Sequence, residues 1–214
     1  MSASLEWMYF LSIDSDLEKL ARYIEFTDSN FGVYSVELVR LYLSTCAEID
    51  TVLKKLCKQT DGDWSNPAKP NIGDYRKSIR RTHRLFCDVK CKIPTYGLEF
   101  CPWCNFGIDP TGTSPDWWQP HNDVKHNRDE NYHQANLKNV LNAAAGLLIG
   151  NLYLMATSSI SHVDLGRFPR PTLFAEPEEL LMSHSRWGGP IPITAEMTAG
   201  DHPVAKWRTS SLTL

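Results

Sequence analysis

The chain has neither a long uninterrupted apolar run nor an excess of basic residues. Its longest apolar stretch, 143–156, contains two glycines and an asparagine, and it falls short of the roughly 20 residues that cross a bilayer. We therefore expect a buried helix there and no membrane association. The formal net charge is -3, which excludes a protein that coats nucleic acid non-specifically. Any contact with RNA has to be local.

The first ten residues also lack the positive charge with which a secretory signal begins. They contain Glu6 and no Lys or Arg, so we expect no export signal and a cytoplasmic protein. In a reducing compartment the six cysteines are expected to be free thiols or metal ligands rather than a disulfide framework.

Hydrophobic periodicity predicts helix over most of the chain. Apolar residues recur every three or four positions over 36–57, without a Gly or Pro to end the helix. The same spacing predicts helices over 13–26, where residues 14 to 16 are cap candidates, and over 74–89, which carries five basic residues. A short helix is predicted from 116 to about 126, and a long one over 129–155.

Prolines and glycines interrupt two other parts of the chain. The segment 91–115 holds several of each and is predicted to be irregular, with room for one short strand pair. Further prolines follow residue 161. We therefore predict an all-α fold, a four- to five-helix bundle over 1–161, with an extended Pro-rich tail over 162–214 packed on it and one helical turn at 178–182.

Polar and basic side chains concentrate between residues 116 and 133, at the predicted junction of two helices. The stretch contains three histidines, one Lys and one Arg. Helix ends favour anions such as phosphate, because free backbone donors and the positive end of the dipole lie there. The tryptophans at 117 and 118 either stack on bases or pack in the core.

Arg128 and His133 are separated by four residues, and Asp129 follows the arginine directly. This spacing resembles the Arg, four to six residues, His motif of the HEPN superfamily, whose helical bundles often dimerise and cut RNA without a metal. The resemblance implies that His133 acts as general acid or base on a ribose 2′-hydroxyl or a leaving oxygen. It implies that Arg128 stabilises charge on the phosphate and that Asp129 orients the pair.

A second resemblance covers roughly residues 8 to 155. The segments 34–38, 47–50, 117–128 and 135–147 look like an uncharacterised family of bacterial helical proteins. Related domains carry a Trp, Asn, Lys-His and Arg run before a long helix, and they resemble HEPN modules of abortive-infection and phage-defence systems. In this chain the run consists of Trp117, Trp118, Asn122, Lys125, His126 and Arg128.

The second resemblance implies that Lys125 and His126 bind the RNA backbone, with Asn122 in support. One departure matters: Asn131 precedes Tyr132 where the family places its histidine. A shift of one residue turns a helical side chain by about 100°. Two alternatives therefore stay open, a pair of Arg128 and His133, or a cluster of Lys125, His126 and Arg128.

Two other patterns leave further alternatives open. Arg76 and His83 also fit a longer Arg and His spacing, and about one such match is expected by chance. Four cysteines form two close pairs with zinc-ligand spacing, so they are either a structural zinc site or free buried thiols; they are Cys87, Cys91, Cys101 and Cys104. The pair 101 and 104 also superficially resembles a thioredoxin-type redox pair, but no βαβ pattern surrounds it.

The sequence thus predicts a HEPN-like, metal-independent endoribonuclease, a homodimeric toxin or phage-defence effector with RNA as partner. No cofactor is expected apart from the zinc alternative. The other hypothesis is a catalytically inactive helical module that binds a partner protein or a nucleotide.

Overall fold

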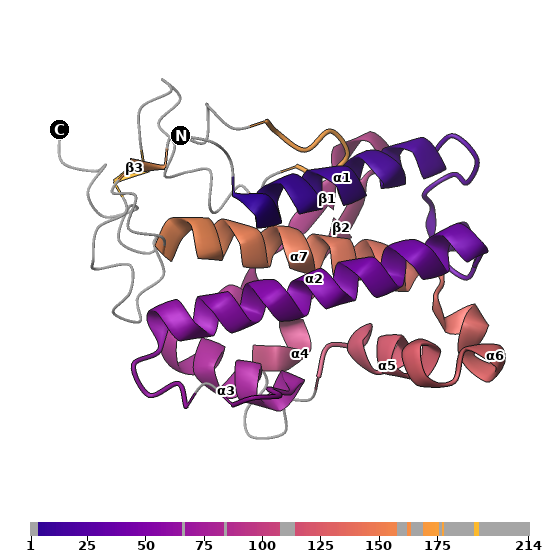
Figure 1. Ribbon diagram of the computed structural model, residues 1–214. Coiled ribbons are helices and arrows are strands. Elements are labelled where there is room, and N and C mark those ends of the chain that lie inside the picture. The colour runs from indigo at the N-terminus through magenta and orange to yellow at the C-terminus, as the bar shows by residue number, and fades with distance from the viewer. Residues whose placement is uncertain are drawn as a thin grey trace, which may run out of the picture.

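The computed structural model describes residues 4–65, 67–83, 85–107, 114–157, 162–163, 169–175, 177 and 191–192. The protein is mostly helical, as predicted (Figure 1). The α-helices in this part of the chain are α1 (Leu5–Leu20), α2 (Val36–Thr60), α3 (Ile72–Thr82), α4 (Cys104–Gly107), α5 (Trp118–His126), α6 (Arg128–Asn131) and α7 (Leu137–Thr157).

Within the part of the chain that the structure describes, two short antiparallel strand pairs accompany the helices. β1 (Cys91–Ile93) pairs with β2 (Leu98–Phe100), with Cys91 opposite Phe100. This hairpin confirms the strand pair expected within the irregular segment. β3 (His162–Val163) pairs with β4 (Ile191–Pro192). The fold is therefore helical with small strand pairs rather than strictly all-α.

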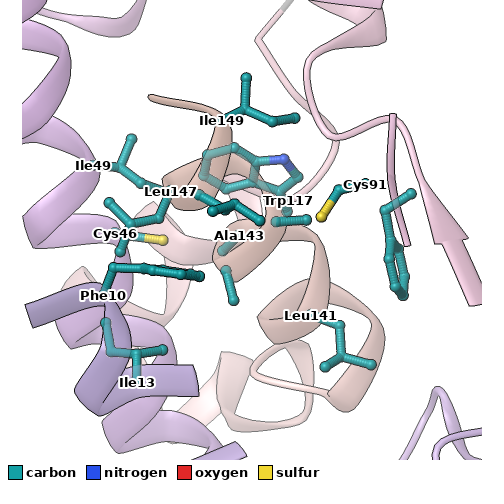
Figure 2. Close-up of a cluster of buried hydrophobic side chains, with 14 of the residues drawn as sticks. Phe10, Ile13, Cys46, Ile49, Cys91, Trp117, Leu141, Ala143, Leu147 and Ile149 are labelled. Carbon is teal, nitrogen blue, oxygen red and sulfur yellow. The ribbon is translucent and has the colours of Figure 1, made fainter. Parts of the chain in front are cut away.

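α7 is the central helix of the bundle. It packs most extensively against α2 and also against α1 (Figure 1), and every residue from Ala143 to Leu154 is buried. Figure 2 shows how Ala143 and Leu147 of α7 meet side chains of α1 and α2 in the core. Among the described residues, α7 alone is long and apolar enough to cross a membrane, yet 83% of its most apolar window is buried inside the protein.

Side-chain caps define where the long helices begin. Ser4 accepts a hydrogen bond from the Trp7 amide at the start of α1, and Ser35 does the same for Leu38 at the start of α2. Asn136 accepts from the Asn139 amide at the start of α7. Each cap satisfies a donor that the helix itself leaves unpaired.

The first helix lies further toward the N-terminus than the sequence pattern predicted. It spans Leu5–Leu20 rather than 13–26, because Ser4 is its cap. Asp14, expected to be a cap, is instead buried and accepts hydrogen bonds from the backbone amides of Thr172, Leu173 and Phe174. The placement of α1 over 13–26 was therefore wrong.

The long helix predicted from residue 129 is broken into three pieces. α6 ends at Asn131, a 3₁₀ turn covers Tyr132–Gln134, and α7 begins only at Leu137. The backbone leaves the helical region at Asn127 and again at Ala135, which has φ -78° and ψ 54°. Asparagines favour such breaks, because their side chains compete with the backbone for hydrogen bonds.

Part of the C-terminal region lies against the bundle. The Trp7 indole donates to the carbonyl of Pro169 at 3.0 Å, and Ala175 forms an antiparallel bridge with Lys92 of β1. Most of the predicted tail, including the helical turn expected at 178–182, lies outside the described residues. The domain limits 1–161 and 162–214 stay a prediction.

Candidate functional site

The two tryptophans that precede the polar run are part of the core. Trp117 is 2% exposed and Trp118 is 9% exposed. The Trp117 indole donates to the carbonyl of Pro102 at 2.8 Å, and the Tyr42 hydroxyl of α2 donates to the carbonyl of Trp117. These contacts fix the start of α5, so core packing, rather than base stacking, is the role of this pair.

His121 of α5 is buried, which the sequence did not predict. Its ring packs edge-on against Tyr42, with centroids 5.9 Å apart, and tilted against Trp118 at 5.4 Å. Burial, together with the charges of Lys125 and His126, lowers the pKa of His121 from 6.5 to about 4. His121 is therefore neutral at pH 7, and its Nδ1 is buried without a hydrogen-bond partner among the described groups.

The chain emerges to the surface after Val124. Every residue from Lys125 to Glu130 is exposed, and Asn122 is half-buried. Lys125 and His126 occupy the last turn of α5, where cations complement the helix dipole. The predicted backbone-binding residues are thus open to solvent at one end of the bundle, where α5 and α6 lie in Figure 1.

Arg128 and His133 lie on consecutive helical turns, α6 and the 3₁₀ turn Tyr132–Gln134, and both are exposed. No hydrogen bond or ion pair within the described residues joins their side chains, and none joins Asp129 to either of them. The structure therefore places the predicted pair on one short surface segment, where no hydrogen bond or ion pair among the described residues joins the two groups.

Other side chains supply the internal hydrogen bonds of this segment. Asn127 donates to Glu130 at 2.7 Å, and Gln134 donates to Asn131 at 2.6 Å. The Asn131 amide group also donates to the carbonyl of Asn127 at 2.9 Å. Amide and carboxylate groups thus hold the turns together, which leaves the guanidinium and the imidazole available for a ligand.

An exposed apolar patch, which we call the 33–36 patch, lies beside this segment. It consists of Val33, Tyr34 and Val36, which are 36%, 51% and 77% exposed. Tyr34 packs edge-on against Tyr132 with ring centroids 5.7 Å apart, and the carbonyl of Val33 accepts a hydrogen bond from the amide of Leu137. Sequence reasoning missed the patch, because Val33 and Tyr34 precede the helical pattern and Val36, its first residue, was expected to belong to the helix.

Arg76 and His83 do not form a comparable pair. His83 is the C-cap of α3, is buried, and packs edge-on against Tyr153 at 5.2 Å. Arg76 is half-buried and donates to the carbonyl of Phe106 at 3.0 Å. The buried imidazole, whose pKa burial lowers to about 4, is not open to a substrate.

The cysteines differ from the sequence expectation in one respect. Cys101 and Cys104 form a disulfide, whereas Cys87 and Cys91 are free, buried thiols. Within the described ranges, no group of three or more His, Cys, Asp or Glu side chains is arranged to hold a metal ion. While the disulfide is intact its two sulfurs are not thiolate ligands, so a four-thiolate zinc site stays a prediction for the reduced chain alone.

Comparisons with known proteins do not assign the chain to a family. No family model matches the chain, and neither a curated protein nor a solved structure shows significant similarity to it. The functional argument therefore depends on the site itself.

Proposed function

We propose that the chain is a HEPN-like, metal-independent endoribonuclease whose catalytic groups are Arg128 and His133. The observation that carries the proposal is the availability of these two side chains. Both are exposed on consecutive turns, while Asn127, Asn131 and their neighbours meet the hydrogen-bonding needs of the segment.

The proposed chemistry uses the 2′-hydroxyl of RNA as nucleophile. An imidazole takes the hydroxyl proton, the 2′-oxygen attacks phosphorus, and the 5′-oxygen leaves with a proton from a second acid. Arg128 stabilises the charge that develops on the phosphate oxygens. The products are a 2′,3′-cyclic phosphate and a 5′-hydroxyl, so DNA is not a substrate.

One imidazole cannot be the base and the acid of the same step, which favours a homodimer. The exposed 33–36 patch supports this arrangement, because apolar surface beside a polar segment is typical of an interaction site. A two-fold axis near the patch would bring His133 of two copies toward one RNA strand. Lys125, His126 and Asn122 would then contact the RNA backbone.

The 33–36 patch also favours the second candidate function, a catalytically inactive module that binds a partner protein. In that case the patch is the recognition surface, and Arg128 and His133 contribute only charge at its rim. The two functions make opposite predictions for RNA cleavage. In both, we expect the protein to act in the cytoplasm.

The test is cleavage of single-stranded RNA by purified protein in EDTA, with end-group analysis of the products. We expect a 2′,3′-cyclic phosphate, no cleavage of DNA, and at least a hundredfold loss of rate in Arg128→Ala and in His133→Gln. Arg22→Ala is the matched control, because Arg22 is also exposed and lies on a different surface loop. Circular dichroism establishes that each variant is folded.

The same assay separates the two candidate clusters. If His126→Gln abolishes cleavage and His133→Gln does not, the cluster of Lys125, His126 and Arg128 is the active one. Absence of cleavage by the folded wild-type protein, or equal rates in wild type and Arg128→Ala, would contradict the nuclease and favour the binding module.

A further inference from the structure

The disulfide between Cys101 and Cys104 differs from the rest of the cysteines in its exposure. Cys104 is exposed and Cys101 is half-buried, whereas the remaining four thiols are buried. Burial raises the pKa of Cys57 and of Cys87 to about 11, and that of Cys91 to about 12. Reagents in solution therefore meet one sulfur, that of Cys104, before any other.

The loop that carries the disulfide is held in place by its two central residues. The buried Trp103 donates its indole N–H to the carbonyl of Gly146 in α7 at 3.2 Å. The carbonyl of Pro102 accepts from the Trp117 indole at 2.8 Å. Both hydrogen bonds are independent of the sulfur–sulfur bond, so the loop stays attached to the core when the disulfide is reduced.

The disulfide is also poorly suited to be a structural cross-link. Its cysteines are three positions apart, and a cross-link over so short a loop removes little freedom from the unfolded chain. A bond that is exposed, short in span and not needed to hold its loop is the kind that exchanges with external thiols.

We propose that Cys101 and Cys104 form a thiol–disulfide exchange site, which accepts electrons from a dithiol reductant through attack at Cys104. A thiolate of the reductant attacks Cys104 Sγ, the bond to Cys101 breaks, and its electron pair leaves on Cys101 Sγ, which takes up a proton. The second thiolate of the reductant then attacks the reductant sulfur of the mixed disulfide. A disulfide forms within the reductant, and the Cys104 thiolate leaves and is protonated. Two electrons and two protons reach the chain, and the reductant becomes a disulfide.

The order of attack distinguishes this site from a merely reducible bond. Because Cys104 is the exposed sulfur, the mixed disulfide forms there and Cys101 is the leaving thiolate. Pro102 and Trp103, which lie between the two cysteines, are held by the core, and Cys101 is half-buried while Cys104 is exposed.

The first experiment counts thiols by maleimide labelling and mass spectrometry in denaturant. Protein purified without reductant should show four thiols, matching the free cysteines of the structure, and protein treated briefly with dithiothreitol under native conditions should show all six. Six thiols before reduction, or four after it, would overturn the proposal.

The second experiment measures the order of attack with glutathione disulfide as probe. Cys101→Ser, which keeps Cys104, should form a glutathione adduct at least tenfold faster than Cys104→Ser, which keeps the half-buried Cys101. The double variant Cys101→Ser/Cys104→Ser is the matched control and should form none. Equal rates in the single variants, or an adduct in the double variant, would contradict the assignment.

A measurement on the wild-type chain keeps the test independent of variant folding. Reduced wild-type protein is exposed to glutathione disulfide, quenched with acid at short times, and mapped by peptide mass spectrometry. Cys101 and Cys104 lie on one peptide, so fragmentation of that peptide assigns the modified cysteine. The adduct is expected on Cys104; an adduct found first on Cys101 would overturn the order proposed here.

Discussion

Gly146 and Trp103 are joined by a hydrogen bond from the indole Nε1 to the glycine carbonyl, 3.2 Å long. Two buried rings occupy the space that a side chain at position 146 would need. A Cβ at this position would lie 3.2 Å from Trp117 Cζ2 and 3.3 Å from Trp103 Cζ2. The close approach of α7 to both tryptophans therefore depends on glycine.

Replacement of Gly146 by alanine should lower the free energy of unfolding by about 1 kcal/mol, because overpacking in the core outweighs the better helix propensity of alanine. Urea denaturation measures the change. Gly32→Ala is the matched control, since nothing lies within 4 Å of a Cβ there, and its stability should change little. A Gly146→Ala variant as stable as the wild type would show that the rings move aside freely.

Tyr42 connects α2 to the start of α5 through its buried hydroxyl. Tyr42→Phe removes the donor and leaves the Trp117 carbonyl without it, so the free energy of unfolding should fall by about 1–2 kcal/mol. Thermal and urea denaturation provide the measurement. Tyr34→Phe at an exposed ring should have almost no effect, and a similar loss in both variants would mean that the Tyr42 hydrogen bond contributes nothing specific.

Asp14 holds the segment 169–175 against α1. Its carboxylate accepts from the amides of Thr172, Leu173 and Phe174, and these donors stay unsatisfied in Asp14→Ala. We expect a loss of about 3 kcal/mol and new proteolytic cleavage near the segment. Asp16→Ala removes an exposed ion pair with Arg40 and should cost about 0.5 kcal/mol. Equal losses in the two variants would contradict the anchoring role.

Two buried histidines, His83 and His121, make stability depend on pH. Burial lowers the pKa of His83 and of His121 from 6.5 to about 4, so between these values the unfolded chain binds more protons than the folded one. Stability is complete above pH 6.5 and is lost as the pH falls toward 4. From pH 7 to pH 5 the loss should be about 2 kcal/mol per histidine.

His121→Phe isolates this effect, because phenylalanine keeps an aromatic ring between Tyr42 and Trp118 and removes the titration. Urea denaturation at pH 7 and pH 5 should show a smaller difference in this variant than in the wild type. The exposed His133→Gln is the control and should keep the full difference. If His121→Phe keeps it as well, His121 is not one of the groups responsible.

Apolar spacing predicted the helices whose apolar face is regular. It failed to place helix ends where a polar side chain is buried or where asparagines break the helix. α2 was predicted to begin at 36, as observed, and to end within three residues of Thr60. The start of α1 was misplaced because Asp is a residue type that often caps helices. Asp14 is instead buried, and its hydrogen-bond partners lie far away in the sequence. The start of α7 was misplaced because apolar spacing alone does not show where asparagines break a helix.

The exposure of the candidate residues was predictable from the sequence, whereas the packing around them was not. Exposure of Arg128, His133, Lys125 and His126 agrees with their proposed roles, while the roles themselves stay predictions. That His121 is a core residue could not be read from the sequence, because its burial comes from Tyr42 on another helix. The partition of cysteines into one disulfide and four buried thiols likewise depends on tertiary contacts.

The position of α7 also has a consequence for biosynthesis. Its main packing partner is α2, and residues 61–136 separate the two helices along the chain. During translation the apolar faces of α1 and α2 emerge long before the surface that will cover them, since contacts so distant in sequence form late. A chaperone that shields these two faces on the ribosome should therefore raise the yield of folded protein.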